Sequence, residues 1–169
     1  MKKYILILLL TISTVSTIAQ ENHKAFDSGE WFKFRIHYGL FTASYATIEI
    51  KEEKLNGIPV HHIVGIGKSS GFLSVFFKVE DYYETYIDKD MVKPYRFIRK
   101  INEGGYTKDI EVNFNHKSNK AFVYDKKHNT KKSFPIQPGV QDMMSSFYYL
   151  RNKINTSSLK IGDEQFVTM

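Results

Sequence analysis

The stretch from Lys93 to His116, KPYRFIRKINEGGYTKDIEVNFNH, contains the clearest fold signal in the chain. Two segments flank the pair Gly104-Gly105, and in the second segment Ile110, Val112 and Phe114 alternate with polar residues. A period of two is typical of a β-strand with one face toward a core, and two glycines between such segments favour a tight hairpin. The stretch therefore predicts two adjacent antiparallel strands.

The same pattern continues on both sides of this hairpin. Similar segments cover residues 31–38, 41–53, 60–68, 75–88 and 120–127, with a last short strand at 132–134, and short turns join them. One turn contains Asn56-Gly57, a strong signal for a type I′ hairpin. Parallel strands need a long crossover, which such short turns do not allow. We therefore expect a mainly β fold: a curled antiparallel meander, an open or half β-barrel of roughly seven or eight strands.

The first of these segments has a simple two-sided pattern. In residues 31–38 the apolar side chains of Phe32, Phe34, Ile36 and Tyr38 fall on one side of the strand, and Lys33, Arg35 and His37 fall on the other. Alternation of this kind predicts a strand with one buried face.

The segment VQDMMSSFYYLRNK, from Val140 to Lys153, predicts an amphipathic α-helix. Met143, Met144, Phe147 and Tyr148 share one face at the spacing of a helix. Asp142 is suited to accept hydrogen bonds from the free amides at the N-terminal end, and Arg151 and Lys153 suit the C-terminal end. We expect this helix to cover the concave side of the sheet.

The first 19 residues have the layout of a secretory leader. Two lysines precede an apolar run, and small residues follow it, so cleavage is expected after Ala19. An uncleaved anchor is the alternative, but Thr11, Ser13 and Ser16 interrupt an apolar run that is shorter than a spanning helix needs. We expect an exported protein of the periplasm or cell envelope, with residues 20–169 forming one β-rich domain and no stable membrane span after cleavage.

Cysteine content and net charge exclude several kinds of site and partner. The chain has no cysteine, which excludes disulfides, thiolate metal sites and a lipid-anchored lipoprotein. Without Lys2 and Lys3 it has 22 basic and 18 acidic side chains, a net charge of +4, which is too small an excess to predict a nucleic-acid partner. The densest basic run, YDKKHNTKKSF, is typical of a solvated hairpin end. Contact of its lysines with an anionic envelope surface is an alternative interpretation.

No motif in the chain predicts a catalytic, cofactor or metal site. GIGKSSG, residues 65–71, ends like a phosphate-binding loop, but His62 stands where its first glycine belongs and an apolar segment follows it. His61 and His62 are neighbours on a strand, so they point to opposite faces and cannot chelate one ion.

Acidic residues between Glu80 and Asp90 alternate with tyrosines, which leaves a hydrolase acting on envelope glycan or lipid as an alternative function. We favour a non-enzymatic domain.

Aromatic residues are the more informative feature. They fill the core of a small barrel or line a pocket for a lipid or glycan, and both interpretations stay open. A third use is contact of the GFLSVFF segment, residues 71–77, with a partner protein or membrane. A structural or assembly factor without a small ligand is a further alternative. The side chains selected as candidates to line a pocket are Phe72, Phe76, Tyr83, Met143, Phe147 and Tyr148.

Taken in order, these segments resemble the bacterial exported proteins of the domain of unknown function 3108 family. The matching motifs are GEWFKFRIHYG followed by ASYA, then VEDYYETYID followed by KPYRF, and QDMMSSFYYLR before LKIGDEQFV. The resemblance covers residues 26–169 and implies a β-rich envelope domain, similar in architecture to the half-barrels that carry lipoproteins, with no catalytic residues to transfer.

The family pattern continues with more strands beyond Gly162-Asp163. Because a further strand is also expected to begin at Glu164, we expect the chain to end inside its domain.

Overall fold

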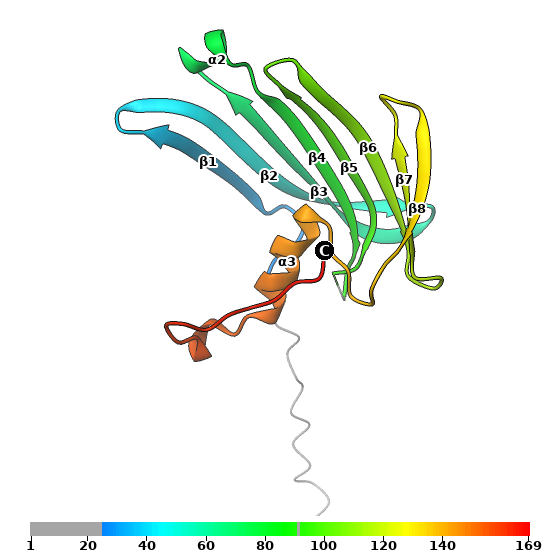
Figure 1. Ribbon diagram of the computed structural model, residues 1–169. Coiled ribbons are helices and arrows are strands. Elements are labelled where there is room, and N and C mark those ends of the chain that lie inside the picture. The colour runs from blue at the N-terminus through cyan, green and yellow to red at the C-terminus, as the bar shows by residue number, and fades with distance from the viewer. Residues whose placement is uncertain (1–24, 91) are drawn as a thin grey trace, which may run out of the picture.

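The computed structural model describes residues 25–90 and 92–169, so the predicted leader lies outside the described residues. Eight antiparallel strands form one sheet in the sequential order β1 to β8 (Figure 1). The elements are β1 (Trp31–Tyr38), β2 (Phe41–Leu55), β3 (Ile58–Ser69), α2 (Leu73–Phe76), β4 (Glu80–Asp88), β5 (Pro94–Glu103), β6 (Tyr106–Asn115), β7 (Lys120–Asp125), β8 (Thr130–Pro135), α3 (Met143–Lys153) and a 3₁₀ turn, η2 (Thr156–Ser158). The predicted meander is confirmed, and the sheet is curled but not closed.

The predicted hairpin turns are formed by residues with positive φ. Asn56 and Gly57 have φ of 51° and 84°, and Gly104 and Gly105 have φ of 57° and 93°. Positive φ at both central positions is the geometry of a type I′ turn, whose twist matches that of the flanking strands. These two turns therefore fix the register of β2 with β3 and of β5 with β6.

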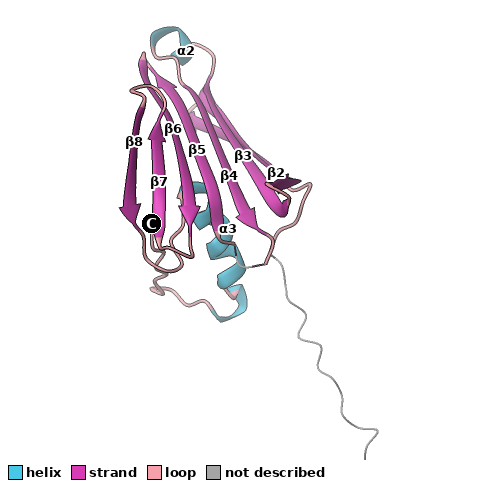
Figure 2. Ribbon diagram, turned by 90° about the vertical axis from the view of Figure 1, so that its right-hand side faces the viewer, coloured by secondary structure: helices cyan, strands magenta, loops and turns pink. Residues whose placement is uncertain are grey.

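The helix α3 lies on the concave side of the sheet and covers only one end of it (Figures 1 and 2). Its buried residues are Met144, Ser145 and Tyr148. Met144 and Tyr148 belong to a core cluster that also contains Phe26, Ile50, Ile63, Ile87 and Val92. The cluster joins the helix, the centre of the sheet and the segment before β1, and it leaves the other end of the concave face uncovered.

Two sequence predictions about elements are wrong. The strand expected over residues 75–88 begins only at Glu80, because residues 73–76 form the one-turn helix α2. The strand expected from Glu164 does not form, since residues 163–169 have no regular structure and a bond from the Gln141 amide to the Thr168 carbonyl (2.8 Å) holds them.

The prediction of a half-buried first strand is also wrong. In β1 only Phe32 is partly buried, while Phe34 and Ile36 are 44% and 52% exposed. The alternation itself is present, but nothing in the described chain covers this part of the concave face.

Candidate functional site

The space between α3 and the sheet is packed. Tyr148 is fully buried, and the Phe26 ring meets it edge to face with ring centroids 4.7 Å apart. Met144 fills the position opposite Gly65, where an added Cβ atom would lie 2.9 Å from the methionine methyl carbon. The glycine therefore admits the Met144 side chain, and the region directly beneath the helix is core and not a ligand cavity.

Asp142 fixes the N-terminal end of α3. One carboxylate oxygen accepts hydrogen bonds from the amides of Met144 (2.8 Å) and Ser145 (2.9 Å), and the other accepts one from the Thr85 hydroxyl (2.6 Å). The Asp142 amide donates to the Ser145 hydroxyl (2.8 Å), which completes a capping box. Burial raises the pKa of Asp142, while these hydrogen bonds lower it. The predicted capping role is confirmed, and the bond to Thr85 additionally ties the helix to β4.

Arg151 fixes the other end of α3. Its guanidinium donates to both carboxylate oxygens of Glu30, at 2.5 and 2.7 Å, and to the carbonyl of Ala25 at 2.7 Å. The guanidinium carbon also lies 5.3–5.8 Å from the centroids of four surrounding aromatic rings. Arg151 therefore connects the helix to the segment before β1.

A row of aromatic rings runs from the core onto the uncovered part of the concave face. Phe147 lies 5.1 Å from Tyr148 and 6.3 Å from Phe32, and Phe32 lies 5.9 Å from Phe34 between ring centroids. Tyr148 is fully buried, whereas Phe147 and Phe34 are 40% and 44% exposed. We define the open concave face as the part beyond α3 that carries Phe34 and Ile36.

Polar groups lie across the sheet on the same face. Asp81 pairs with Gly67 in the ladder, and Tyr83, Phe97 and Arg99 follow on β4 and β5. Burial raises the pKa of Asp81, and the neighbouring Glu103 carboxylate raises it further. The Nε atom of Arg99 is buried without a hydrogen-bond partner in the described chain. The open concave face is therefore apolar on β1 and charged on β4 and β5.

The end of the sheet opposite α3 is strongly apolar. There a hollow of about 800 Å³ lies between the β1–β2 turn and α2, lined mainly by Tyr38, Leu40, Phe41, Phe72 and Leu73. Phe72 and Phe76 are 76% and 70% exposed, and their rings lie 4.6 Å apart. These two pocket candidates are therefore at the opposite end of the sheet from the helix candidates.

The structure thus divides the predicted pocket residues among three places. Tyr148 is part of the core, and Met143 and Phe147 lie on α3 at 45% and 40% exposure. Tyr83 packs partly buried against the core and stacks with Phe97 at 6.4 Å. Met143 also lines a smaller hollow of about 440 Å³ beside Phe97, Phe114 and the C-terminal segment. No single cavity in residues 25–90 and 92–169 brings all six candidates together.

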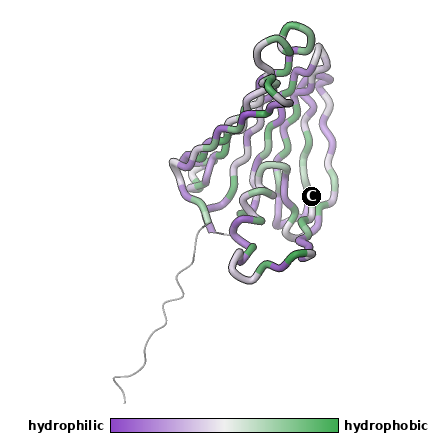
Figure 3. The backbone as a smooth tube through the Cα atoms, turned by 90° about the vertical axis from the view of Figure 1, so that its left-hand side faces the viewer, coloured by the Kyte–Doolittle hydropathy of each residue, from purple (hydrophilic) through white to green (hydrophobic). Residues whose placement is uncertain are grey.

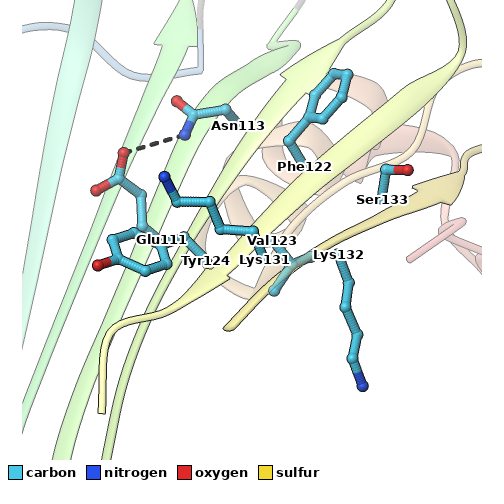
Figure 4. A pocket seen from close by; sticks show the side chains of 8 residues that line it. All are labelled: Glu111, Asn113, Phe122, Val123, Tyr124, Lys131, Lys132 and Ser133. Carbon is cyan, nitrogen blue, oxygen red and sulfur yellow. Dashed lines mark hydrogen bonds between the residues drawn. The ribbon is translucent and has the colours of Figure 1, made fainter. Parts of the chain in front are cut away.

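The convex face carries a hollow of about 530 Å³ on β6, β7 and β8, which Figure 4 shows from close by. Glu111 accepts hydrogen bonds from Asn113 (3.0 Å) and Lys126 (2.8 Å). Lys126 and then Asn113 lower the pKa of this carboxyl group, against the effect of burial. Lys131 and Lys132 point in opposite directions in Figure 4, as neighbours on a strand must. Glu111 already pairs with Lys126, and the Lys131 ammonium lies 4.9 Å from the centroid of the Tyr124 ring.

The acidic residues of β4 do not form one site. Glu80 pairs with Lys68 (2.9 Å) and Lys78 (3.6 Å), and Asp81 lies on the concave face. Glu84 lies on the convex face and contacts His62 (2.8 Å) and Tyr86 (2.9 Å). Hydrolysis of a glycosidic bond needs two carboxylates on either side of one bond, which this distribution does not provide within β4.

The neighbouring histidines point to opposite faces, as predicted. His61 is buried against Phe26 with ring centroids 5.7 Å apart, and His62 stacks on Tyr86 at 4.2 Å. Within the part of the chain that the structure describes, no three potential metal ligands come together.

Comparison with known proteins places the chain in a family. The family model described as "Protein of unknown function (DUF3108)" matches residues 33–169. The chain belongs to the DUF3108 family. No curated protein and no solved structure matches this DUF3108 chain. None of its helices, as far as they are described, is long and apolar enough to cross a bilayer.

Sequence reasoning missed several residues that define these surfaces. Arg99, Leu40 and Phe41 carried no motif, and their setting depends on which hairpins α3 leaves uncovered. The small residues Ala46 and Gly67, opposite Phe34 and Asp81 in the ladder, were a usable signal for an open face.

Proposed function

We propose that this DUF3108 chain is an exported, non-enzymatic envelope domain whose open concave face binds an apolar or amphipathic ligand. The observation that carries the proposal is the exposure of Phe34 and Ile36 on the face that elsewhere forms the core. Apolar side chains that continue a core row into solvent are typical of a binding surface. The leader-like N-terminus supports export.

The opposite side of this face favours an amphipathic ligand over a purely apolar one. Arg99 places a guanidinium on this side of the face, and Asp81 supplies a second polar group near it. An acidic head group forms charge-assisted hydrogen bonds with a guanidinium. A chain lying along Phe32 and Phe34 with its head group toward Arg99 would use both sides of the face.

The first test is native mass spectrometry of the protein purified from the envelope fraction. The measured mass also identifies the N-terminal residue of the mature chain. We expect a mature chain beginning at Gln20 that carries a lipid-like mass. The second test is titration with a fluorescent C16 fatty acid. Ile36→Asp should weaken binding by about tenfold or more, because a carboxylate would have to be desolvated against an apolar chain.

Ile58→Asp is the matched control, since Ile58 is 51% exposed but is the first residue of β3, next to the β2–β3 turn. Arg99→Met should weaken binding of the fatty acid more than binding of the corresponding alcohol. Equal binding by wild type and Ile36→Asp would contradict the proposal.

A hydrolase remains the second candidate because Asp81 has a raised pKa and lies beside Glu103. A carboxyl group near a second carboxylate is the arrangement of a general acid. The same mass spectrometry separates the two candidates. An intact bound ligand supports the binding function. Conversion of added envelope lipid or glycan supports the enzyme if the Asp81→Asn variant does not carry it out.

A further inference from the structure

The two apolar loops at the end of the sheet opposite α3 form a surface that the ligand proposal does not use. We call this surface the apolar tip; it comprises the β1–β2 turn, with Tyr38, Leu40 and Phe41, and the α2 loop, with Phe72, Val75 and Phe76. The exposed fractions of these six side chains run from 70% to 100%. In Figure 3 the α2 loop at this end of the molecule is coloured largely as hydrophobic. Single exposed apolar residues are common, but six on adjacent loops mark an interaction surface.

The α2 loop is held in place without burying its own apolar side chains. The Ser74 hydroxyl donates to the Gly71 carbonyl (2.7 Å), the Phe77 amide to Leu73 (2.8 Å), and the Ser70 amide to Ala43 on β2 (2.9 Å). The Phe77 ring lies against Gly104 of the β5–β6 turn. No residue of α2 is buried. Hydrogen bonds and Phe77 therefore fix the loop, while Phe72, Val75 and Phe76 contribute nothing to the core.

Basic side chains lie at the same end of the sheet. Because the strands alternate in direction, the β1–β2, β3–β4, β5–β6 and β7–β8 turns all lie at the same end of the sheet. The β7–β8 hairpin contributes Lys127, Lys131 and Lys132, in addition to Lys126, which pairs with Glu111 (2.8 Å). Lys78, next to the α2 loop, is 70% exposed and lies 3.6 Å from the Glu80 carboxylate. This end of the sheet thus combines apolar loops with several lysines.

We infer that the apolar tip docks on the surface of an anionic phospholipid bilayer. The side chains come from two loops that line one hollow. Leucine and phenylalanine side chains of this kind enter the boundary between head groups and acyl chains, and nearby lysines add attraction to anionic lipid.

This inference goes beyond the proposed ligand binding and fails independently of it. Ile36→Asp changes the open concave face and should leave vesicle binding unchanged. Tip substitutions should leave fatty-acid binding unchanged.

The test is co-sedimentation of the chain beginning at Gln20 with vesicles of phosphatidylglycerol and phosphatidylcholine. We expect the partition coefficient to fall by about tenfold or more in the double variant Phe72→Glu, Phe76→Glu, because two apolar insertions are replaced by charges that anionic lipid repels. Ile161→Glu with Phe166→Glu is the matched control. These side chains are 108% and 80% exposed and lie in the C-terminal segment near α3, at the other end of the molecule.

The lysines are tested separately by charge reversal. Lys127→Glu with Lys131→Glu should reduce binding severalfold to anionic vesicles only. Lys54→Glu with Lys117→Glu, exposed lysines at the opposite end of the sheet, should not reduce it.

Insertion is read from tryptophan fluorescence. In a Trp31→Phe background, Phe76→Trp should shift its emission to shorter wavelength on vesicles, and Ile58→Trp should not. Circular dichroism and thermal unfolding confirm that each variant is folded.

Three outcomes would overturn the inference: no sedimentation of the wild type with anionic vesicles, equal sedimentation of the Phe72→Glu, Phe76→Glu variant, or no emission shift for Phe76→Trp. A concentration-dependent dimer that the tip variant abolishes, without vesicle binding, would assign the surface to a second copy of the chain instead.

Discussion

Asp142 accepts three hydrogen bonds at a buried position between α3 and β4. Asp142→Ala removes the cap of α3 and leaves two amides and the Thr85 hydroxyl without this acceptor, so we expect the free energy of unfolding to fall by about 2–4 kcal/mol. Asp142→Asn keeps an acceptor for both amides and should cost less than half as much. Urea denaturation of both variants measures the difference. An equal loss would show that the charge, and not the cap, matters.

The lowered pKa of Glu111, on the convex face, predicts that the stability of the protein depends on pH. Its pKa is lowered below the ordinary 4.5, first by Lys126. A depressed carboxyl pKa adds stability that is fully present above pH 4.5 and is lost as the pH falls through the folded-state pKa. Glu111→Gln should therefore destabilise the protein by up to about 1 kcal/mol at pH 7, and the difference should shrink below pH 4.5. Denaturation curves between pH 3 and pH 7 measure it.

In a Lys126→Met background this pH-dependent difference should become much smaller. If Glu111→Gln has the same effect at all pH values in both backgrounds, the ion pair is not its cause.

At the scale of elements, turns and caps could be predicted because they depend on a few neighbouring residues. Asn56-Gly57, Gly104-Gly105 and the capping role of Asp142 follow from local chemistry. The α2 loop could not be predicted, since a short apolar run such as FLSVFF fits a buried strand and a helical turn equally well. Its exposure depends on how far α3 reaches across the sheet, which no local pattern contains.

The helix α3 presents a buried hydroxyl that its packing does not satisfy. The Tyr148 hydroxyl has no hydrogen-bond partner within the described structure, and burial raises its pKa. Tyr148→Phe should therefore leave stability unchanged or raise it by up to about 1 kcal/mol, and Tyr148→Ala should lower it by about 3–5 kcal/mol.

Tyr149→Phe is the neighbouring control for thermal unfolding. Its hydroxyl accepts a bond from Lys153 (3.0 Å) in a more exposed setting, so removing it should give a small loss. Destabilisation by Tyr148→Phe greater than that by Tyr149→Phe would reveal a partner for the buried hydroxyl.

At the scale of the whole molecule, the sequence predicted a curled open sheet with one helix but not how the parts are joined. The strand order follows from short turns alone. Two of the contacts that hold α3 in place join residues more than 100 positions apart: Ala25 with Asn152 (3.0 Å) and Glu30 with Arg151. The open concave face and the apolar tip exist because these contacts dock the helix at one end only.

The ion pair Glu30–Arg151 predicts an energetic coupling between the segment before β1 and the helix α3. It is a partly buried, bidentate ion pair, and Arg151 also packs on the Phe26 ring. Arg151→Met and Glu30→Gln should each cost about 2–3 kcal/mol, with a coupling energy of about 1–2 kcal/mol in the double-mutant cycle. Arg151→Lys should recover only part of the loss because an ammonium cannot make the bidentate contact.

Lys153→Met, on the same turn of the helix but exposed, is the control and should change stability by less than about 0.5 kcal/mol. Hydrogen exchange adds a test of position: in Arg151→Met the amides of α3 and residues 25–30 should lose protection together, while β5 and β6 keep theirs. Independent loss in the two segments would mean that Phe26 and Tyr148, and not the ion pair, hold the helix on the sheet.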